Sequence, residues 1–239
     1  MKLILEGIKQ AFILIFTGNK EILNIIFLTL KVSGIAIIIS LIIGIPLGFF
    51  VGLNNFKGKK FIVSLINTGM GLPPVAVGLL VSIFLWRSGP LGFLNLMFTP
   101  TAMIIAQIII ATPIISGITL SAAAQVNKNL KLQAFSLGAN NLQTMWILAK
   151  EAKLPTLAAI MAGFGGIISE VGAVIMVGGN IKGKTQVLTT AIVQMVRMGK
   201  FEVAIAFVII LLIIVFAINA LLTFIQQKES PWWNSKWMK

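Results

Sequence analysis

The stretch VGGNIKGKT, residues 177–185, has the residue types of a phosphate-binding loop. Gly178, Gly183, Lys184 and Thr185 fit the spacing G-x-x-x-x-G-K-[ST], in which backbone amides and a lysine hold the phosphates of a nucleotide. AVIMV upstream could form the strand, and QVLTTAIVQMV downstream the helix, that such a loop joins. Nucleotide hydrolysis is therefore the first chemistry to weigh.

The rest of the composition argues against that chemistry. A working phosphate loop lies in a parallel sheet and usually needs an Asp to hold magnesium. The chain has no Asp, His or Cys, and Glu170 and Glu202 lie beside or within apolar runs. We therefore interpret the glycine-lysine match as coincidence, and we expect no catalytic residues, metal site or cofactor. An enzyme is kept as an alternative, although no set of nucleophile, base or metal-ligating residues in the sequence supports it.

The overall composition indicates a membrane protein. Hydrophobic residues make up 58% of the 239 residues and charged residues 10%. A soluble domain has about 25% charged residues, so this chain has too little polar surface to cover a water-soluble globule. The net charge of +13 favours anionic lipid or an anionic solute as a partner. We expect contact with a lipid bilayer and none with nucleic acid.

Five apolar stretches are long enough to cross a bilayer, which takes about 20 residues of helix. They are residues 25–53, 61–86, 102–120, 156–177 and 203–225. The segment before them, 1–24, reads as an interfacial helix because it is short and carries Glu6 and Lys9. The division that follows is an N-terminal segment 1–24, a transmembrane domain 25–226 containing the polar loop 121–155, and a tail 227–239.

Small residues and prolines predict how these spans pack. Gly44, Gly48 and Gly52 recur every fourth residue, which lets another helix approach closely. Pro46, Pro73, Pro74 and Pro113 are expected to interrupt helices at depth. Charge leaves the orientation open, because one side of the membrane would hold ten Lys or Arg residues and the other eight.

The polar segment 121–155 has the composition of a helix–turn–helix loop. Helix-forming residues flank the sequence GANN at 138–141, and Gly and Asn tolerate the left-handed backbone of a sharp turn. Leu132, Phe135 and Leu137 give the first half an apolar edge too small for a core of its own. Such an edge is suited to docking on another protein.

This segment resembles the cytoplasmic loop by which permease subunits of ABC importers dock on their ATPase. That loop carries the pattern E-A-A-x-x-x-G, and here Leu132 and Gln133 replace the first two residues whereas Ala134 and Gly138 match. The Leu-Pro that follows the pattern in the family appears four residues late, at 154–155. The resemblance assigns ATPase coupling to Leu132, Gln133, Ala134, Phe135, Ser136, Leu137, Gly138 and Ala139.

Three other stretches resemble the molybdate/tungstate branch of this family. They are LTLKVSG at 28–34, LPPVAVGLL at 72–80 and ISEVGAVIMVGGNIKG at 168–183, the last of which is most similar to tungstate permeases. The resemblance implies an all-α integral membrane protein with about five transmembrane helices, a type I ABC importer permease fold and a cytoplasmic coupling helix. It also implies a homodimer with the transport pathway between the copies.

The implied partners are two ATP-binding subunits inside, which would hydrolyse ATP, and a solute-binding protein outside. Because the coupling loop must face the cytosol, the N-terminus would lie outside and the C-terminus in the cytoplasm. The stretch 177–185 would then lie at the outer end of a span, away from ATP. The implied substrate is tungstate, with molybdate or another oxyanion as an alternative.

Three sets of residues are candidates on the pathway and the outer face. Residues 186–199 should form an amphipathic helix whose apolar stripe includes Val187, Ala191 and Met195, either resting on the bilayer or forming an outer gate. Lys31 and Glu170 are predicted to lie at matched depth and to form an ion pair beside the pathway. The outer basic cluster, which steers an anion or docks the binding protein if it is not simply solvated, consists of Lys182, Lys184, Arg197 and Lys200.

A partner-independent secondary transporter or channel is the alternative from another class. Such a protein is expected to carry ion-coupling groups at mid-membrane and often an inverted repeat. The sequence shows only Lys31 and Glu170 as clear intramembrane charges and no evident repeat.

Overall fold

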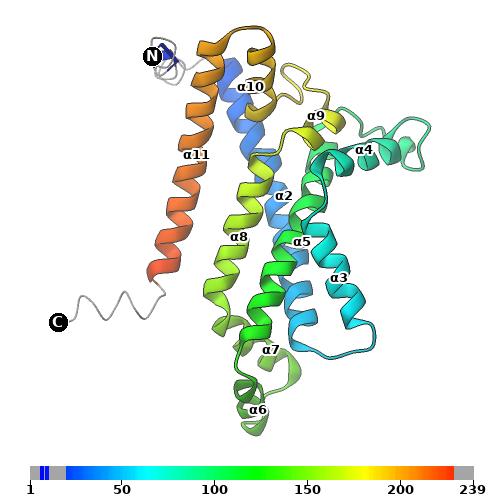
Figure 1. Cartoon of the computed structure of the whole chain (residues 1–239), viewed down its shortest axis with the longest axis vertical. Helices are drawn as coiled ribbons and strands as arrows, with labels where there is room; N and C mark the ends of the chain where they lie inside the picture. Colours follow the sequence, from blue (N-terminus) through cyan, green and yellow to red (C-terminus); the bar gives the residue numbers. More distant parts are fainter. Residues whose placement is uncertain (1–5, 8, 11–19, 229–239) are drawn as a thin grey trace, which may run out of the picture. The chain divides into compact units, whose positions relative to one another are not determined.

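The computed structural model describes residues 6–7, 9–10 and 20–228, and every regular element in the part from 20 to 228 is helical (Figure 1). The long helices are α2 (Lys20–Leu53), α5 (Pro100–Gln125) and α11 (Phe201–Lys228). The shorter elements are α3 (Lys59–Met70), α4 (Pro74–Leu85), η1 (Gly92–Leu94), α6 (Lys128–Ser136), α7 (Asn141–Glu151), α8 (Lys153–Ile168), α9 (Gly172–Gly178) and α10 (Leu188–Arg197).

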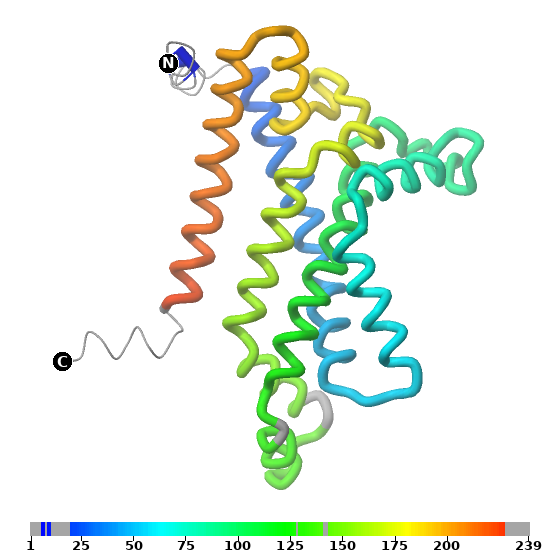
Figure 2. The backbone as a smooth tube through the Cα atoms, in the orientation of Figure 1, coloured from blue at the N-terminus to red at the C-terminus, as the bar shows by residue number. Residues whose placement is uncertain are grey.

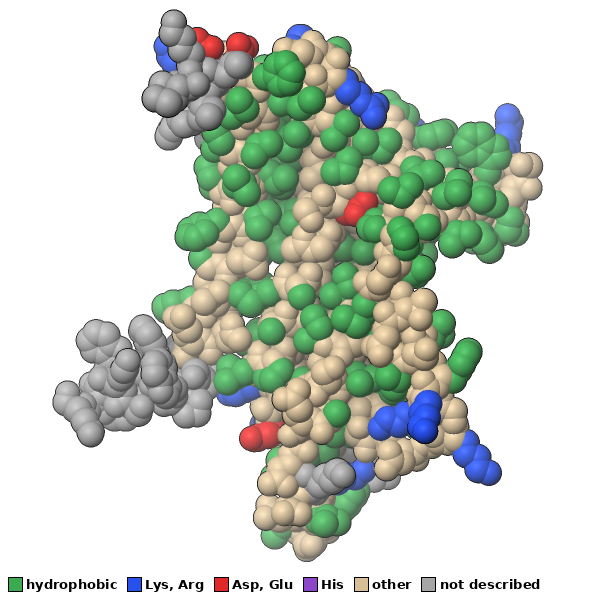
Figure 3. All heavy atoms as spheres, viewed as in Figure 1, with side chains coloured by type: hydrophobic (Ala, Val, Ile, Leu, Met, Phe, Trp, Pro, Cys, Tyr) green, Lys and Arg blue, Asp and Glu red, His purple; other side chains and the backbone are tan. Residues whose placement is uncertain are grey.

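Three helices of the described chain are long and apolar enough to cross a membrane, and the number rises to five if each of two bent pairs is one span. The pairs are α3 with α4, and α7 with α8, which meet at 73°. The expected all-α architecture with about five spans is therefore confirmed. Figure 3 shows hydrophobic side chains spread widely over the visible surface and charged side chains only sparsely.

Two of the predicted spans are broken rather than continuous. The span at 61–86 divides at residues 71–73, where Pro73 is extended and Pro74 begins α4. The span at 156–177 divides at residues 169–171 between α8 and α9. The other predicted interruptions are wrong, because α2 continues through Pro46 and α5 continues through Pro113. The course of the chain through these breaks can be followed in Figure 2.

The chain folds as two compact units. Of the described residues, unit 1 contains those up to 37 together with 72–110 and 165–218, and unit 2 contains 38–71, 111–164 and 219–228. In unit 1, a core of Ile22, Ile25, Leu188, Ala191, Phe207 and Ile210 joins α2, α10 and α11. In unit 2, Phe49 of α2 packs against Ala122 and Ala123 of α5 and against Ala152.

The glycine stripe of α2 lies against α5 within unit 2. A Cβ atom on Gly44 would lie 3.0 Å from the Ile115 side chain, and one on Gly48 would lie 2.6 Å from the Ser116 carbonyl oxygen. One on Gly52 would lie 2.6 Å from the Cβ of Ala123. The predicted close helix approach is confirmed, and the approaching helix belongs to the same chain.

The two ends of the chain differ from the predicted boundaries. Helix α2 begins at Lys20, five residues before the predicted span, and α11 runs to Lys228. Most of the predicted interfacial segment 1–24 and nearly all of the tail 227–239 lie outside the described residues.

The contact between α2 and α5 can be tested with matched glycine substitutions. Gly48→Ala should destabilise the protein by about 1–3 kcal/mol, because the new methyl group meets backbone that cannot move aside. Gly34, in the same helix, has nothing within 4 Å of its Cβ position. Gly34→Ala should therefore be neutral or stabilising by up to about 1 kcal/mol through helix propensity. Unfolding of the two purified variants in detergent measures both effects, and equal stability of the two would contradict the packing.

Candidate coupling segment and outer loop

Helices α6 and α7 in unit 2 form a helix–turn–helix with a cap at each helix start. The Asn127 side chain accepts a hydrogen bond from the Asn129 amide at 2.9 Å and begins α6. Asn140 and Gln143 form a reciprocal capping box, with bonds of 2.8 and 2.9 Å, that begins α7. Asn is a preferred residue at this position because its side chain satisfies a free backbone amide.

The turn between the two helices depends on Gly138. Its φ of +82° lies in the left-handed region, which glycine adopts without steric cost. The amide of Gly138 donates to the Phe135 carbonyl at 2.9 Å, and that of Ala139 donates to the Ala134 carbonyl at 3.0 Å. These bonds end α6, so the predicted break at 138–141 is confirmed.

The predicted apolar edge of α6 is exposed. Leu132 is 65% exposed, Phe135 40% and Leu137 88%, whereas Ala134 is buried. Leu132 and Leu137 also line a surface pocket of about 520 Å³ together with Asn129, Gln133 and Ser136. Large apolar side chains exposed together next to a hollow are typical of a surface that binds another protein.

The loop that resembles a phosphate-binding motif lacks the structure of one. It follows helix α9 rather than a strand. The amides of Lys184, Thr185 and Gln186 all donate to the Ile181 carbonyl, at 3.0, 2.9 and 3.1 Å. The Thr185 hydroxyl, which would face magnesium in a nucleotide site, is buried and donates to the Gly178 carbonyl at 2.6 Å. These backbone amides and the Thr185 hydroxyl are thus already engaged within the loop, and only the exposed Lys184 side chain stays free of these bonds.

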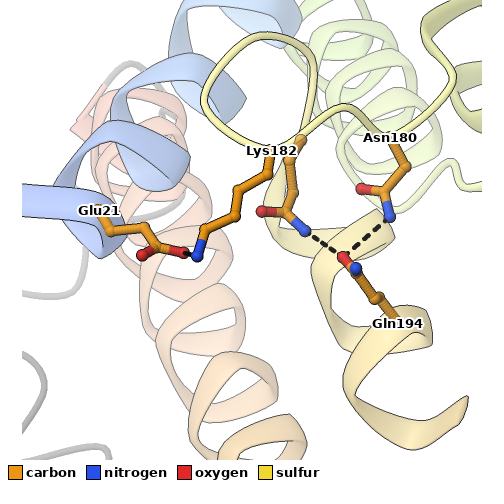
Figure 4. Close-up of polar contacts among 5 residues, drawn as sticks. Glu21, Asn180, Lys182 and Gln194 are labelled. Carbon is orange, nitrogen blue, oxygen red and sulfur yellow. Dashed lines mark hydrogen bonds and ion pairs between the residues drawn. The ribbon is translucent and has the colours of Figure 1, made fainter. Parts of the chain in front are cut away.

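Side-chain amides tie this loop to α10, as Figure 4 shows. The Gln194 carbonyl oxygen accepts a hydrogen bond from Asn180 at 3.1 Å and a second from Gln186. Lys182 forms an ion pair with Glu21 of α2 at 2.8 Å, and both side chains are largely exposed. An ion pair so exposed contributes little, so the partly buried side-chain amides and the backbone bonds hold the loop.

The amphipathic helix predicted at 186–199 is confirmed as α10, and its stripe packs inside unit 1. Leu188 and Ala191 are buried against α2 and α11, and Val187 is buried as well. Met195 is half-buried against the same cluster, and Val196 is exposed. The gate candidates Val187 and Ala191 thus lie in the core of their own chain, so only the C-terminal end of the stripe is open to another partner.

Two buried threonines of α10, which the helical pattern placed off the stripe, are held by hydrogen bonds. The Thr189 hydroxyl donates to the Glu170 carbonyl at 3.2 Å, and the Thr190 hydroxyl donates to the Val187 carbonyl at 3.0 Å. Sequence reasoning also missed Thr29, whose buried hydroxyl accepts the Leu188 amide at 2.9 Å. A polar residue within the apolar run of α2 was the available signal.

The ion pair predicted between Lys31 and Glu170 is absent from the ion pairs of the described residues. Lys31 is exposed, and one carboxylate oxygen of Glu170 accepts the Ala173 amide at 3.0 Å. The physical reason is the break at 169–171, which the sequence reading did not place. It creates a new helix start at Gly172, and the carboxylate satisfies a backbone donor there.

The outer basic cluster consists of exposed side chains. Lys184, Arg197 and Lys200 are exposed, as is Lys182, the cluster member paired with Glu21. Lys184 also lines a pocket of about 280 Å³ with Asn24, Gln186 and Glu21, so a carboxylate lies close to it.

Comparison with known proteins identifies the family. Residues 44–231 match the family described as binding-protein-dependent transport system inner membrane component. The chain belongs to this family. It is therefore a multi-pass inner-membrane permease, a transport component rather than a catalytic subunit. The permease is similar to the tungstate uptake system permease protein TupB of Peptoclostridium acidaminophilum, with 41% identity over 95% of this chain and all of the relative.

Two further comparisons agree with this assignment. A probable anion ABC transporter permease protein of Haloferax volcanii is 42% identical over 84% of the permease and 88% of its own length. The fold is similar to that of a chain in a bacterial ABC transporter involved in import of the acidic polysaccharide alginate, with a TM-score of 0.76 over 92% of the permease and 84% of that chain. Their identity of 20% shows a shared fold alone.

The role of Glu170 as a helix cap predicts the outcome of a double-mutant cycle with Lys31. Glu170→Ala should destabilise the permease by about 1 kcal/mol, and Glu170→Gln, which keeps an acceptor oxygen, by less. Lys31→Met should have the same effect in the wild type and in the Glu170→Ala background. Unfolding in detergent gives the coupling energy between Lys31 and Glu170. A value above about 1 kcal/mol would show that the two side chains do form an ion pair.

Proposed function

We propose that this permease is the membrane-spanning subunit of an ATP-driven importer of a tungstate-type oxyanion. The observation that supports this most strongly is the similarity to a tungstate permease over nearly the whole chain. A net charge of +13 suits a protein that passes an anion. Selectivity among oxyanions is assigned to a separate solute-binding protein, which the family requires.

The exposed edge of α6 is proposed as the docking surface for the ATPase. Leu132, Phe135 and Leu137 would enter a groove of the ATP-binding subunit, and Gly138 would set the angle at which α6 meets it. Leu132 replaces the usual Glu, so the contact would depend on apolar burial rather than on a carboxylate. ATP hydrolysis would take place in that partner.

The assembly is proposed to contain two copies of the permease, two ATP-binding subunits and a solute-binding protein. The coupling segment 121–155 would face the cytoplasm, the N-terminus would lie outside and the C-terminus inside. Lys184, Arg197 and Lys200 would then supply outward positive charge, which attracts an anion over about one screening length of 8 Å at physiological salt.

Co-expression with its cognate ATP-binding subunit tests the proposed function. The two chains should purify together, and proteoliposomes containing them should accumulate tungstate only when ATP and the solute-binding protein are both present. Uptake that needs neither, driven by an ion gradient, would contradict the proposal and favour a secondary transporter.

The coupling role predicts the effect of Gly138→Val. A β-branched residue at a φ of +82° is strained, so the turn should re-form at another angle and ATP hydrolysis should continue without tungstate uptake. Gly183→Val is the matched control. Gly183 has a φ of +75°, also in the left-handed region, and both glycines have nothing within 4 Å of their Cβ positions.

The control variant should keep hydrolysis and uptake coupled. Equal loss of coupling in the two variants would indicate general backbone strain, and normal uptake by Gly138→Val would remove Gly138 from the coupling mechanism. The ratio of tungstate transported to ATP hydrolysed, measured in proteoliposomes, separates these outcomes.

A further inference from the structure

A pocket of about 280 Å³ lies in unit 2 where α2 ends and α6 begins. Four polar side chains line it: Asn55 from the segment after α2, Lys59 from the start of α3, and Lys131 and Asn127 from α6 and its cap. The rest of its lining is apolar or glycine and comes from the ends of α2 and α5 and from Leu148 of α7. The pocket thus joins five helices or helix ends of one unit.

Two lysine ammonium groups converge on the last carbonyls of α2. Lys59 Nζ donates to the carbonyls of Gly52, at 3.3 Å, and Asn54, at 2.9 Å. Lys131 Nζ contacts the Leu53 carbonyl between them at 3.5 Å. Both lysines are half-buried, which holds their charges at the pocket rather than in bulk water.

Among the described lining residues, no carboxylate balances these two charges. The segments 38–71 and 111–164 of this unit contain seven lysines and one acid, Glu151, which does not line the pocket. The carbonyl dipoles at the ends of α2 and α5 together compensate about one unit of charge, which is less than the two ammonium groups carry. The pocket is therefore electropositive.

Among the polar side chains that line the pocket, the groups with hydrogen-bonding capacity to spare are mainly donors. The Asn55 side-chain oxygen accepts Lys59 Nζ, at 3.5 Å, and the Asn127 side-chain oxygen accepts the Asn129 amide. The amide NH2 groups of both asparagines remain, together with the N–H groups that Lys131 does not use for its one long contact. Positive charge combined with a surplus of donors selects an anion with several acceptor oxygens.

We propose that this pocket binds an oxyanion, either a free tetrahedral oxyanion or the phosphate of a lipid headgroup, between Lys59 and Lys131. Occupancy would link the end of α2 to α6, one residue before the exposed Leu132. A bound anion would thus restrict the coupling segment. The cytoplasmic location of the pocket, and so its access to an anion released inside, rests on the proposed function; the site itself does not.

Hydrogen exchange on the full-length permease in phosphatidylcholine nanodiscs tests the proposal, with sodium tungstate as the probe. Tungstate should slow exchange of the backbone amides in 126–136 more than an equal concentration of sodium chloride does. Binding at the outer basic cluster would leave this segment unchanged, so the readout is local. The measurement needs neither the ATPase nor transport. The proposed site can therefore be disproved even if tungstate uptake is demonstrated.

Substitutions at Lys131 and Lys57 give the matched comparison. Lys131→Gln should raise the tungstate concentration needed for half-maximal protection by about tenfold, as expected for loss of a hydrogen bond to a charged group. Lys131→Arg should keep the wild-type concentration. Lys57→Gln removes an exposed lysine that lies between α2 and α3 and does not line the pocket, and it should change nothing. Lys131 is the better target than Lys59, whose ammonium group makes three contacts that hold the end of α2.

Nanodiscs that also contain phosphatidylglycerol distinguish the two sources of the anion. Protection of 126–136 in these discs without tungstate, lost in Lys131→Gln, would identify a lipid phosphate as the occupant. Protection by tungstate in neutral discs alone would identify a free oxyanion. If neither addition protects the segment, or if Lys131→Gln responds as the wild type does, the lysines only cap α2 and the proposal is wrong.

Discussion

The close contact of α2 with α5 is the constraint on which unit 2 depends. Glycine at positions 44, 48 and 52 removes the side chains that would hold the two backbones apart. The end of α2 therefore lies beside the end of α5, from which the chain leads through Asn127 into α6. The carbonyls that attract Lys59 and Lys131 and the helix that carries the exposed leucines are neighbours for this reason. A packing feature far from any chemistry thus positions the surface that we assign to ATPase coupling.

Unit 1 depends more on hydrogen bonds than on side-chain size. The segment from Glu170 to Gln194 has two helices of modest length and a loop, and an apolar environment leaves no water to satisfy their exposed backbone groups. Glu170, Thr185 and Thr190 meet this need locally, and Thr29 meets it from α2. The polar residues of this region are structural partners of the backbone. This explains how the spacing of a nucleotide-binding motif can occur in a chain whose motif residues bond to their own loop instead.

The sequence predicted the elements better than the contacts between them. Long apolar runs predict spans because the bilayer imposes a length, and the GANN turn predicts the end of α6 because few residues adopt a positive φ. The glycine spacing predicts a close helix neighbour, but not that it is α5. The predicted Lys31–Glu170 ion pair is wrong, because the prediction from matched depth assumed a continuous helix. The chain breaks at 169–171, and there the Glu170 carboxylate accepts the nearby Ala173 amide. Pro46 and Pro113 lie inside continuous helices, whereas Pro73 and Pro74 lie at a break and begin α4.

The pairing of α4 with α9 has a consequence for biosynthesis. At about 1.5 Å per residue the 12 residues of α4 are too short to cross a bilayer, so α4 cannot insert as an independent span. Its partner at Gly78 is Ala173 of α9, whose backbone lies where a side chain on Gly78 would stand. The ribosome makes α9 only after α5, α6, α7 and α8 have emerged. Helix α4 must therefore wait, held by the membrane-insertion machinery or by lipid, until the second half of the protein has been translated.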